Sequence, residues 1–173
     1  MEPVRRSYSS MNAPVRFLFA AVIVLLATGR LKASPVIFVV RHAEKLAMLG
    51  NDPNLSPAGQ KRAEALARML KDANIMAIFT SQFKRTQETA APLAKATNVT
   101  STSVAANDLP QLIQKLREGQ GNALVVGHGD TIPQLMKMLG INEAVQIPDN
   151  DYGELFVVSM TDKPQLLRLH YPF

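Results

Sequence analysis

The chain has 173 residues, of which 47% are hydrophobic and 19% are charged. This length and composition predict one domain with a packed core and exclude global disorder. The sequence contains no cysteine, which excludes disulfide scaffolds, thiol nucleophiles and cysteine-based zinc or iron–sulfur sites.

The net charge of +5 is concentrated at the N-terminus. Residues 1–33 carry five cations and one Glu, a net charge of +4. The other 140 residues carry 14 Lys or Arg against 13 Asp or Glu. Because the body of the chain is nearly neutral, it has no broad basic surface, and we expect no nucleic-acid partner.

The first 33 residues have the pattern of a secretory signal peptide or N-terminal leader. Basic residues precede an apolar run at 17–27, and small residues follow it. That run is shorter than the roughly 20 residues of a spanning helix, so we expect no stable membrane span in the mature domain, 34–173. The pattern predicts export to the periplasm or outside the cell, with translation starting at Met1 or Met11. The alternative is a membrane anchor formed by an uncleaved leader.

The body of the chain alternates predicted strands with predicted helices. Three short, uninterrupted apolar runs predict buried strands at 36–40, 75–79 and 123–126. Two further strands are expected at 155–160 and 166–171, joined as a hairpin through 162–164. Residues 98–108 are polar and fit either a strand or a loop.

Helices are expected between these strands. Ser56 followed by Pro57 predicts a helix start, and apolar residues at helical spacing follow it. The other helices are expected at 84–96, where Pro92 should weaken or kink the helix, at 110–118, and at 131–139 before Gly140. Strands alternating with helices predict an α/β fold, a three-layer α/β/α arrangement around a mostly parallel central sheet.

Cationic and imidazole side chains follow the three predicted core strands. Arg41 and His42 follow the first strand, Arg85 lies just beyond the second, and His128 ends the third. Ligands bind beyond the carboxyl ends of parallel strands, so these side chains should meet in one crevice. Two guanidinium groups in a crevice predict an anion site, because they match phosphoryl oxygens in pairs. The arginines beside both histidines argue against a metal site.

Four segments resemble, in order and spacing, the motifs of the histidine phosphatase (phosphoglycerate mutase-like) superfamily. They are RHAE at 41–44, LSPAGQKRAEALARML at 55–70, TSQFKRTQETAAPLA at 80–94 and VVGHGDTIP at 125–133. The resemblance covers residues 36–140, and the short chain is similar to the compact branch of the superfamily. It implies a phosphoglycerate mutase-like fold and a phosphatase that needs no metal or other cofactor and acts on a small phosphorylated substrate.

The resemblance also implies roles for the crevice residues. His42 matches the nucleophile, which forms a covalent phosphohistidine intermediate that water then hydrolyses. Arg41, Arg85 and His128 match the residues that hold the phosphoryl oxygens, whose charge needs fixed cations around it. Glu44 could tune His42 or contact substrate, or be a solvated loop residue. Ser81 could donate to the phosphate, or act only in a turn or cap.

The general acid has two candidates in the sequence. Asp108 lies 23 residues after Arg85, about where mutase-like relatives carry an acidic residue. Asp130 follows His128 by two residues, and it could instead cap the helix expected from Thr131. If neither serves, the substrate should have a good leaving group, such as a phosphohistidine or a phosphoanhydride.

Two other functions remain compatible with the same residues. A phosphomutase would use the same nucleophile, but it needs a closed pocket, which this short chain lacks insertions to build. A non-catalytic module that binds phosphate or phosphosugars would keep the arginines and His128 without needing His42. The exported phosphatase is therefore the main hypothesis, with phosphomonoesters, such as phosphorylated envelope sugars, or phosphohistidine as substrates.

Overall fold

The computed structural model describes residues 34–47 and 50–172. The predicted leader at 1–33 lies outside these residues. Within them, no helix is long and apolar enough to cross a membrane.

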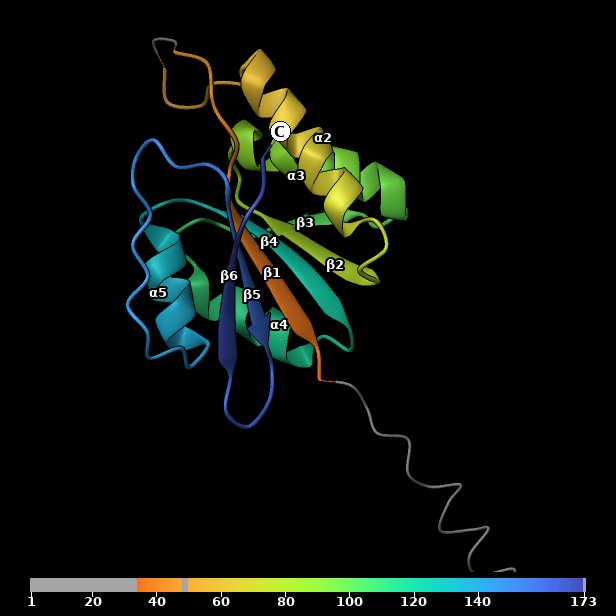
Figure 1. The fold of residues 1–173 in the computed structure, drawn as a ribbon, viewed down its shortest axis with the longest axis vertical. Helices are drawn as coiled ribbons and strands as arrows, with labels where there is room; N and C mark the ends of the chain where they lie inside the picture. The colour runs from red at the N-terminus through yellow and green to blue at the C-terminus, as the bar shows by residue number, and fades with distance from the viewer. Residues whose placement is uncertain (1–33, 48–49, 173) are drawn as a thin grey trace, which may run out of the picture. The chain divides into compact units, whose positions relative to one another are not determined.

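One six-stranded sheet forms the centre of the fold, in the order β3-β2-β4-β1-β5-β6 (Figure 1). The strands are β1 (Val36–Arg41), β2 (Ile75–Thr80), β3 (Ser101–Ser103), β4 (Asn122–Gly127), β5 (Glu154–Ser159) and β6 (Gln165–His170). The first four run parallel to their neighbours among themselves, whereas β5 pairs with β1 and with β6 in antiparallel fashion. The predicted mostly parallel sheet and C-terminal hairpin are therefore confirmed.

Four helices connect the strands: α2 (Pro57–Leu70), α3 (Lys84–Thr97), α4 (Leu109–Glu118) and α5 (Thr131–Met138). The side chain of Ser56 caps α2 by accepting from the backbone N–H of Gly59 at 3.1 Å, with Pro57 at the first helical position, as the sequence predicts. Helix α3 runs continuously through Pro92 to an Asn98 cap in the left-handed conformation. Gly140, with φ of +90°, follows the end of α5.

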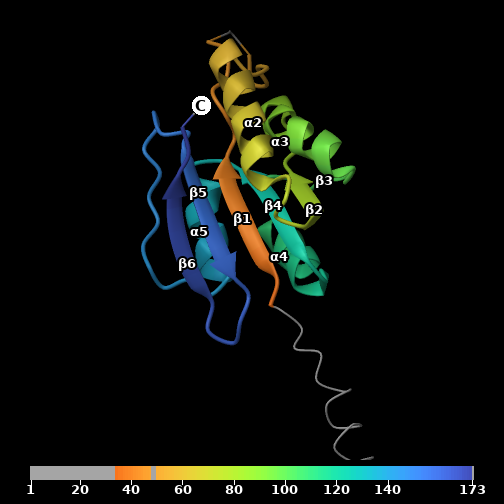
Figure 2. The ribbon, with the colours of Figure 1, turned by 45° about the vertical axis from the view of Figure 1, so that its right-hand side comes forward.

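The sheet is covered on both faces, which confirms the three-layer architecture. Helices α2 and α3 pack on one face, where Leu66 and Leu93 join Ile78 and Leu124 in a buried cluster. Helices α4 and α5 pack on the other face in a second buried cluster that includes Val39. Figure 2 shows the two helix pairs on opposite sides of the sheet.

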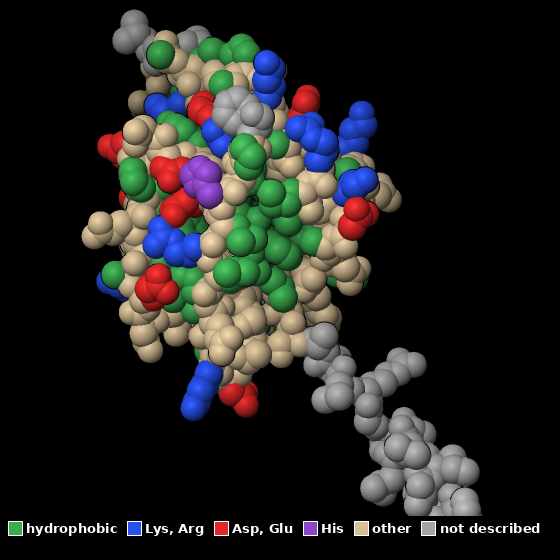
Figure 3. All heavy atoms as spheres, viewed as in Figure 1, with side chains coloured by type: hydrophobic (Ala, Val, Ile, Leu, Met, Phe, Trp, Pro, Cys, Tyr) green, Lys and Arg blue, Asp and Glu red, His purple; other side chains and the backbone are tan. Residues whose placement is uncertain are grey.

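The two edge strands differ from the core strands in exposure. All three residues of β3 are exposed, which explains why its polar sequence carries no apolar pattern. On the other edge, β6 leaves Leu167 and Leu169 56% and 43% exposed. The face viewed in Figure 3 carries hydrophobic side chains gathered near its centre, with charged side chains around them.

Candidate active site

The carboxyl ends of β1, β2 and β4 bring the predicted residues to one edge of the sheet. The β1–β4 register places Arg41 beside Gly127, and the backbone N–H of His42 donates to the Gly127 carbonyl at 3.0 Å. The rings of His42 and His128 lie 5.4 Å apart. Arg85 reaches the same place from the first turn of α3. One cleft is lined by Arg41, His42, Phe83, Arg85, Ala106, His128, Gly129, Asp130, Thr131, Ile147 and Asp149.

His42 is buried, and one of its ring nitrogens is fixed by the backbone. Its Nδ1 lies 2.8 Å from the carbonyl oxygen of Ala43, which can only accept, so Nδ1 carries the hydrogen in the neutral ring. The Ala43 N–H in turn donates to Thr89 of α3 at 2.9 Å. Burial lowers the pKa of His42 to about 4, and the nearby His128, Arg85 and Arg41 act in the same direction, against the hydrogen bond to Ala43. At neutral pH the ring is uncharged, and Nε2 holds its lone pair.

Arg41 is held by carbonyl groups of the loop that precedes β5. Its Nη1 donates to the carbonyls of Pro148 and Asp149 at 2.9 Å each, and to that of Asp151 at 3.2 Å. The guanidinium carbon lies 4.4 Å from the ring centre of Tyr152. Within the described residues, Arg41 Nε is buried and has no hydrogen-bond partner. An uncompensated donor of this kind is suited to receive an anion.

Arg85, which also lines the cleft, is held by a backbone carbonyl, a carboxylate and an aromatic ring. Its Nη1 donates to the carbonyl of Asn51 at 3.4 Å and lies 3.9 Å from the Asp52 carboxylate. Its guanidinium carbon stacks 4.3 Å from the ring centre of Phe83. Its Nε is likewise buried with no partner in the described part of the chain. Two arginines that line the cleft thus each have a buried guanidinium N–H group with no acceptor among the described residues.

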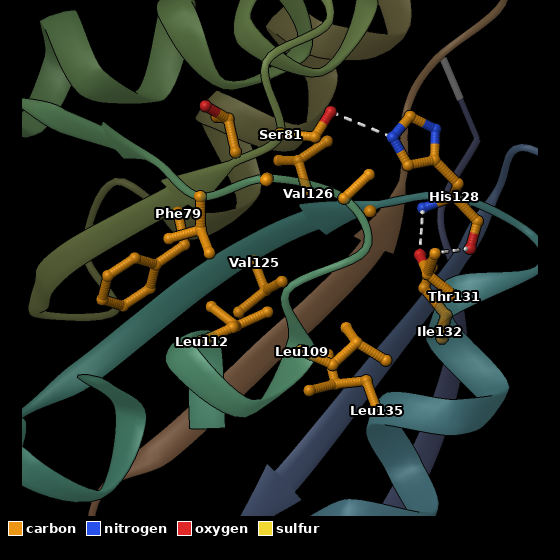
Figure 4. A pocket seen from close by; sticks show the side chains of 15 residues that line it. Phe79, Ser81, Leu109, Leu112, Val125, Val126, His128, Thr131, Ile132 and Leu135 are labelled. Carbon is orange, nitrogen blue, oxygen red and sulfur yellow. Dashed lines mark hydrogen bonds between the residues drawn. The ribbon is translucent and has the colours of Figure 1, made fainter. Parts of the chain in front are cut away.

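His128 is held by a chain of hydroxyl groups behind the cleft, and Figure 4 shows the first link, between His128 and Ser81. Its Nε2 lies 2.9 Å from Ser81 Oγ, which lies 2.9 Å from Thr86 Oγ1. The Thr86 hydroxyl donates its hydrogen to the Phe83 carbonyl at 2.8 Å, so Thr86 Oγ1 can only accept from Ser81. Because Ser81 donates its own hydrogen to Thr86, Ser81 Oγ accepts from His128. His128 therefore carries its hydrogen on Nε2 when the ring is neutral. Burial, followed by Arg85, lowers the pKa of His128 to about 4.

Two of the predicted substrate contacts, Ser81 and Glu44, lie outside the lining of the cleft. Ser81 lines a small apolar cavity of about 30 Å³ behind His128 and is absent from the lining of the cleft. Glu44 forms a two-pronged ion pair with Arg62 of α2, with Nη2 to Oε1 at 2.7 Å and Nε to both carboxylate oxygens at 2.9 Å. Arg62 also donates to the Tyr171 carbonyl at 3.3 Å. The structure therefore gives Ser81 a contact with His128, and Glu44 a place between the loop after β1, α2 and the C-terminal segment.

The two candidate acids, Asp108 and Asp130, have different surroundings in the structure. Asp108 caps α4, because its side chain accepts from the Gln111 N–H at 3.1 Å, and it is absent from the lining of the cleft. Asp130 lines the cleft with His42 and His128. It occupies the N-cap position of α5, but its side chain makes no capping hydrogen bond. Of the two, only Asp130 lines the cleft that contains His42 and His128.

Several residues that shape the site have no signal in the sequence. Phe83 packs edge-on against the His128 ring at 5.4 Å and beneath Arg85. Thr86 and Thr89 use hydroxyl groups on α3 to hold Ser81 and Ala43. Helical spacing in residues 84–96 indicates which side of α3 faces inward, but it does not indicate that this side holds the two histidine segments in position.

Comparison with known proteins finds a family that matches part of the chain and solved structures that share its fold. A family model, histidine phosphatase superfamily (branch 1), matches residues 37–112. A solved structure of the protein histidine phosphatase SixA with tungstate has a TM-score of 0.64 at 18% identity, covering 78% of this chain and 96% of that one. A mycobacterial glucosyl-3-phosphoglycerate phosphatase with VO3 has a TM-score of 0.65 at 14% identity, covering 80% and 100%. Residues 37–112 thus match the histidine phosphatase superfamily, and the phosphoglycerate mutase-like fold expected from the sequence is confirmed.

A higher sequence identity is confined to a short segment. Human 6-phosphofructo-2-kinase/fructose-2,6-bisphosphatase 4 is 41% identical over 63 residues, which are 33% of this chain and 13% of that protein. The rat protein of the same name is 39% identical over 64 residues, 34% of this chain and 14% of the relative. The matched part is thus a small fraction of these relatives.

Proposed function

We propose that the protein is a phosphatase that hydrolyses phosphomonoesters, or phosphohistidine, through a covalent intermediate on His42. The observation on which this depends is the hydrogen bond from His42 Nδ1 to the Ala43 carbonyl at 2.8 Å, because it leaves the lone pair on Nε2 for attack. The pKa of about 4 supports the same role, since a neutral imidazole is the nucleophile.

In the first step, the Nε2 lone pair attacks phosphorus, the N–P bond forms, and the P–O bond to the alcohol breaks. Arg41 and Arg85 each offer an unpartnered buried Nε–H to the phosphoryl oxygens, so their positive charge stabilises the transition state. These two fixed cations supply the charge that the step requires, and we propose that no metal takes part. Water then attacks the phosphohistidine, which releases phosphate and restores His42.

The incoming dianion also changes His128. In the free protein, burial and the positive charge of Arg85 lower the pKa of His128. The negative charge of the bound dianion opposes the effect of Arg85 and therefore raises that pKa. Because Ser81 already accepts from Nε2, the added proton resides on Nδ1. His128 becomes a charged donor when the phosphoryl group is present.

We propose Asp130 as the general acid that protonates the leaving alcohol and then activates water. Asp130→Asn should lower kcat strongly for alkyl phosphates and weakly for para-nitrophenyl phosphate, whose leaving group needs no proton. Asp108→Asn is the matched control, because it removes a carboxylate that caps α4 outside the cleft. Equal effects of both substitutions on alkyl phosphates would rule out this assignment.

The covalent intermediate is the decisive test. The protein is mixed briefly with a ³²P-labelled phosphomonoester and quenched in alkali, with His42→Ala and His170→Ala as variants. His170 is exposed and absent from the lining of the cleft, so it is the matched control. We expect alkali-stable, acid-labile label in the wild type and in His170→Ala, none in His42→Ala, and turnover that persists with chelator. Full turnover in His42→Ala would refute the mechanism, and phosphate binding without turnover in the wild type would indicate a non-catalytic binding module.

We also propose that the protein is exported to the periplasm or outside the cell. The support is the basic N-terminus followed by the apolar run at 17–27. Expression of the full chain in a bacterium, fractionation, and N-terminal sequencing of the product would test it. A cytoplasmic product that begins at Met1 or Met11 would contradict export.

A further inference from the structure

A groove continues from the cleft between α4 and α5. The cleft has a volume of about 580 Å³ and the groove about 440 Å³. Both are lined by Ala106, Asp130 and Thr131, so they adjoin along the residue proposed as general acid. An alcohol that takes its proton from Asp130 lies at the entrance of this groove.

The cleft and the groove differ in the charged side chains that line them. Among the described residues that line them, the only cationic side chains are those of Arg41 and Arg85. Both belong to the phosphoryl site. Asp130, the proposed general acid, and Asp149 carry the acidic side chains in the described lining. A second anionic group on the substrate would therefore meet acidic side chains and no free cation.

The groove itself offers neutral contacts of two kinds. Leu109, Pro110 and Met138 provide apolar surface, and Met138 is 37% exposed. Asn107 and Gln134 provide amide groups. The Gln134 amide nitrogen donates to the Asp130 carbonyl at 3.2 Å, which fixes the side chain and leaves its oxygen as an acceptor. Such a surface suits an alcohol with hydroxyl or amide donors and an apolar part.

We propose that this groove binds the leaving group and selects phosphate esters whose alcohol portion carries no negative charge, either neutral or cationic. The inference rests on the proposed phosphatase function. Asp149 discriminates against anionic leaving groups from the wall of the cleft, while its backbone carbonyl holds Arg41. Because Asp149 is exposed, we expect a discrimination of about fivefold in kcat/KM.

The test uses two esters of nearly equal size, 3-carbamoylphenyl phosphate and 3-carboxyphenyl phosphate. The readout is the ratio of their kcat/KM values in each protein, so that the intrinsic difference between the leaving groups cancels when variants are compared. We expect the wild type to prefer the carbamoyl ester. Asp149→Asn should lower the ratio severalfold, and the backbone carbonyl that holds Arg41 is retained.

A gain of charge tests the groove itself. Asn107 is exposed, lines the groove and lies outside the lining of the cleft, so Asn107→Lys adds a cation where the proposed leaving group lies. We expect this variant to raise kcat/KM for the carboxy ester severalfold and so to lower the ratio. Asp162→Asn, in the turn between β5 and β6 at the opposite end of the sheet, is the matched control and should leave the ratio unchanged (Figure 1).

The outcomes separate this inference from the proposed function. Absence of turnover with both esters would contradict the phosphatase assignment. Turnover without preference in the wild type, or an unchanged ratio in Asn107→Lys, would overturn the placement of the leaving group in the groove. An unchanged ratio in Asp149→Asn would overturn the role of that carboxylate.

Discussion

Replacing Ser81 by Ala isolates the contribution of the hydroxyl chain behind His128. In the wild type, Ser81 Oγ accepts from His128 Nε2 at 2.9 Å, and His128 is only 8% exposed. The variant leaves this buried N–H without an acceptor. The ring then regains a hydrogen bond either by turning or by moving its hydrogen to Nδ1. Both responses alter the group that the proposed function assigns to the phosphoryl oxygens.

The expected cost follows from the burial of the two groups. A buried donor that loses its acceptor costs about 1–3 kcal/mol, so unfolding should become easier by that amount. A ring displaced by a fraction of an ångström in a phosphoryl-transfer site costs roughly 10- to 100-fold in kcat. Ser103→Ala, on the exposed edge strand β3, removes a hydroxyl without a buried partner and should change neither quantity.

The tautomer of His128 provides a readout that a loss of stability alone would not alter. The chain has three histidines, so long-range ¹H–¹⁵N spectra resolve each ring. We expect a protonated Nε2 on His128 in the wild type at neutral pH, and a mixture of tautomers in Ser81→Ala. Thr86→Val removes the acceptor of the Ser81 hydrogen and should shift the same signal. An unprotonated Nε2 in the wild type would refute the assigned direction of the hydroxyl chain.

Two further predictions concern stability. The pKa of His42 is about 4 in the folded protein and roughly 6.5 in the unfolded chain, so the unfolded state binds more protons as the pH falls. Stability should therefore decrease from pH 7 to pH 5 by roughly 2 kcal/mol from this residue. Urea unfolding at several pH values measures this loss of stability. If the free energy of unfolding fell with pH as steeply in His42→Asn as in the wild type, the prediction would be contradicted. Gly59→Ala places a Cβ against the backbone oxygen of Glu44 and should destabilise by about 3 kcal/mol or more, whereas Gly119→Ala, whose nearest contact is 3.4 Å, should change the Tm little. An unchanged Tm in Gly59→Ala would show that the loop after β1 moves away without cost.

Much of the fold follows from local patterns that were predictable. Short apolar runs of β-branched residues marked β1 and β4, and the Ser-Pro pair marked the start of α2, because these signals depend on neighbours in sequence. The edge strand β3 was ambiguous because it is exposed on both sides and pairs only with β2. Pro92 was expected to weaken or kink helix α3, and the helix continues through it without interruption.

The site was predictable only where topology alone decides position. Parallel strands deliver Arg41 and His128 to one edge regardless of side-chain detail. The partner of Glu44 depends on how α2 packs beside the loop after β1, and no spacing encodes that contact. Asp108 and Asp130 look alike as Asp residues before helices. Their backbones differ, because Asp130 has helical dihedrals of −84° and −30°, and its side chain makes no cap bond.

The three carbonyls around Arg41 have a consequence for how binding depends on the rest of the chain. A carboxylate in their place would cancel the guanidinium charge, whereas carbonyl dipoles position the group and leave its charge intact. The rotamer entropy of the arginine, about 2 kcal/mol, is lost during folding and not when the ligand arrives. The backbone from Pro148 to Asp151 therefore holds Arg41 in the orientation proposed to bind the anion. Changes in the length or conformation of this backbone should alter the affinity for the anion even where no side chain touches the ligand.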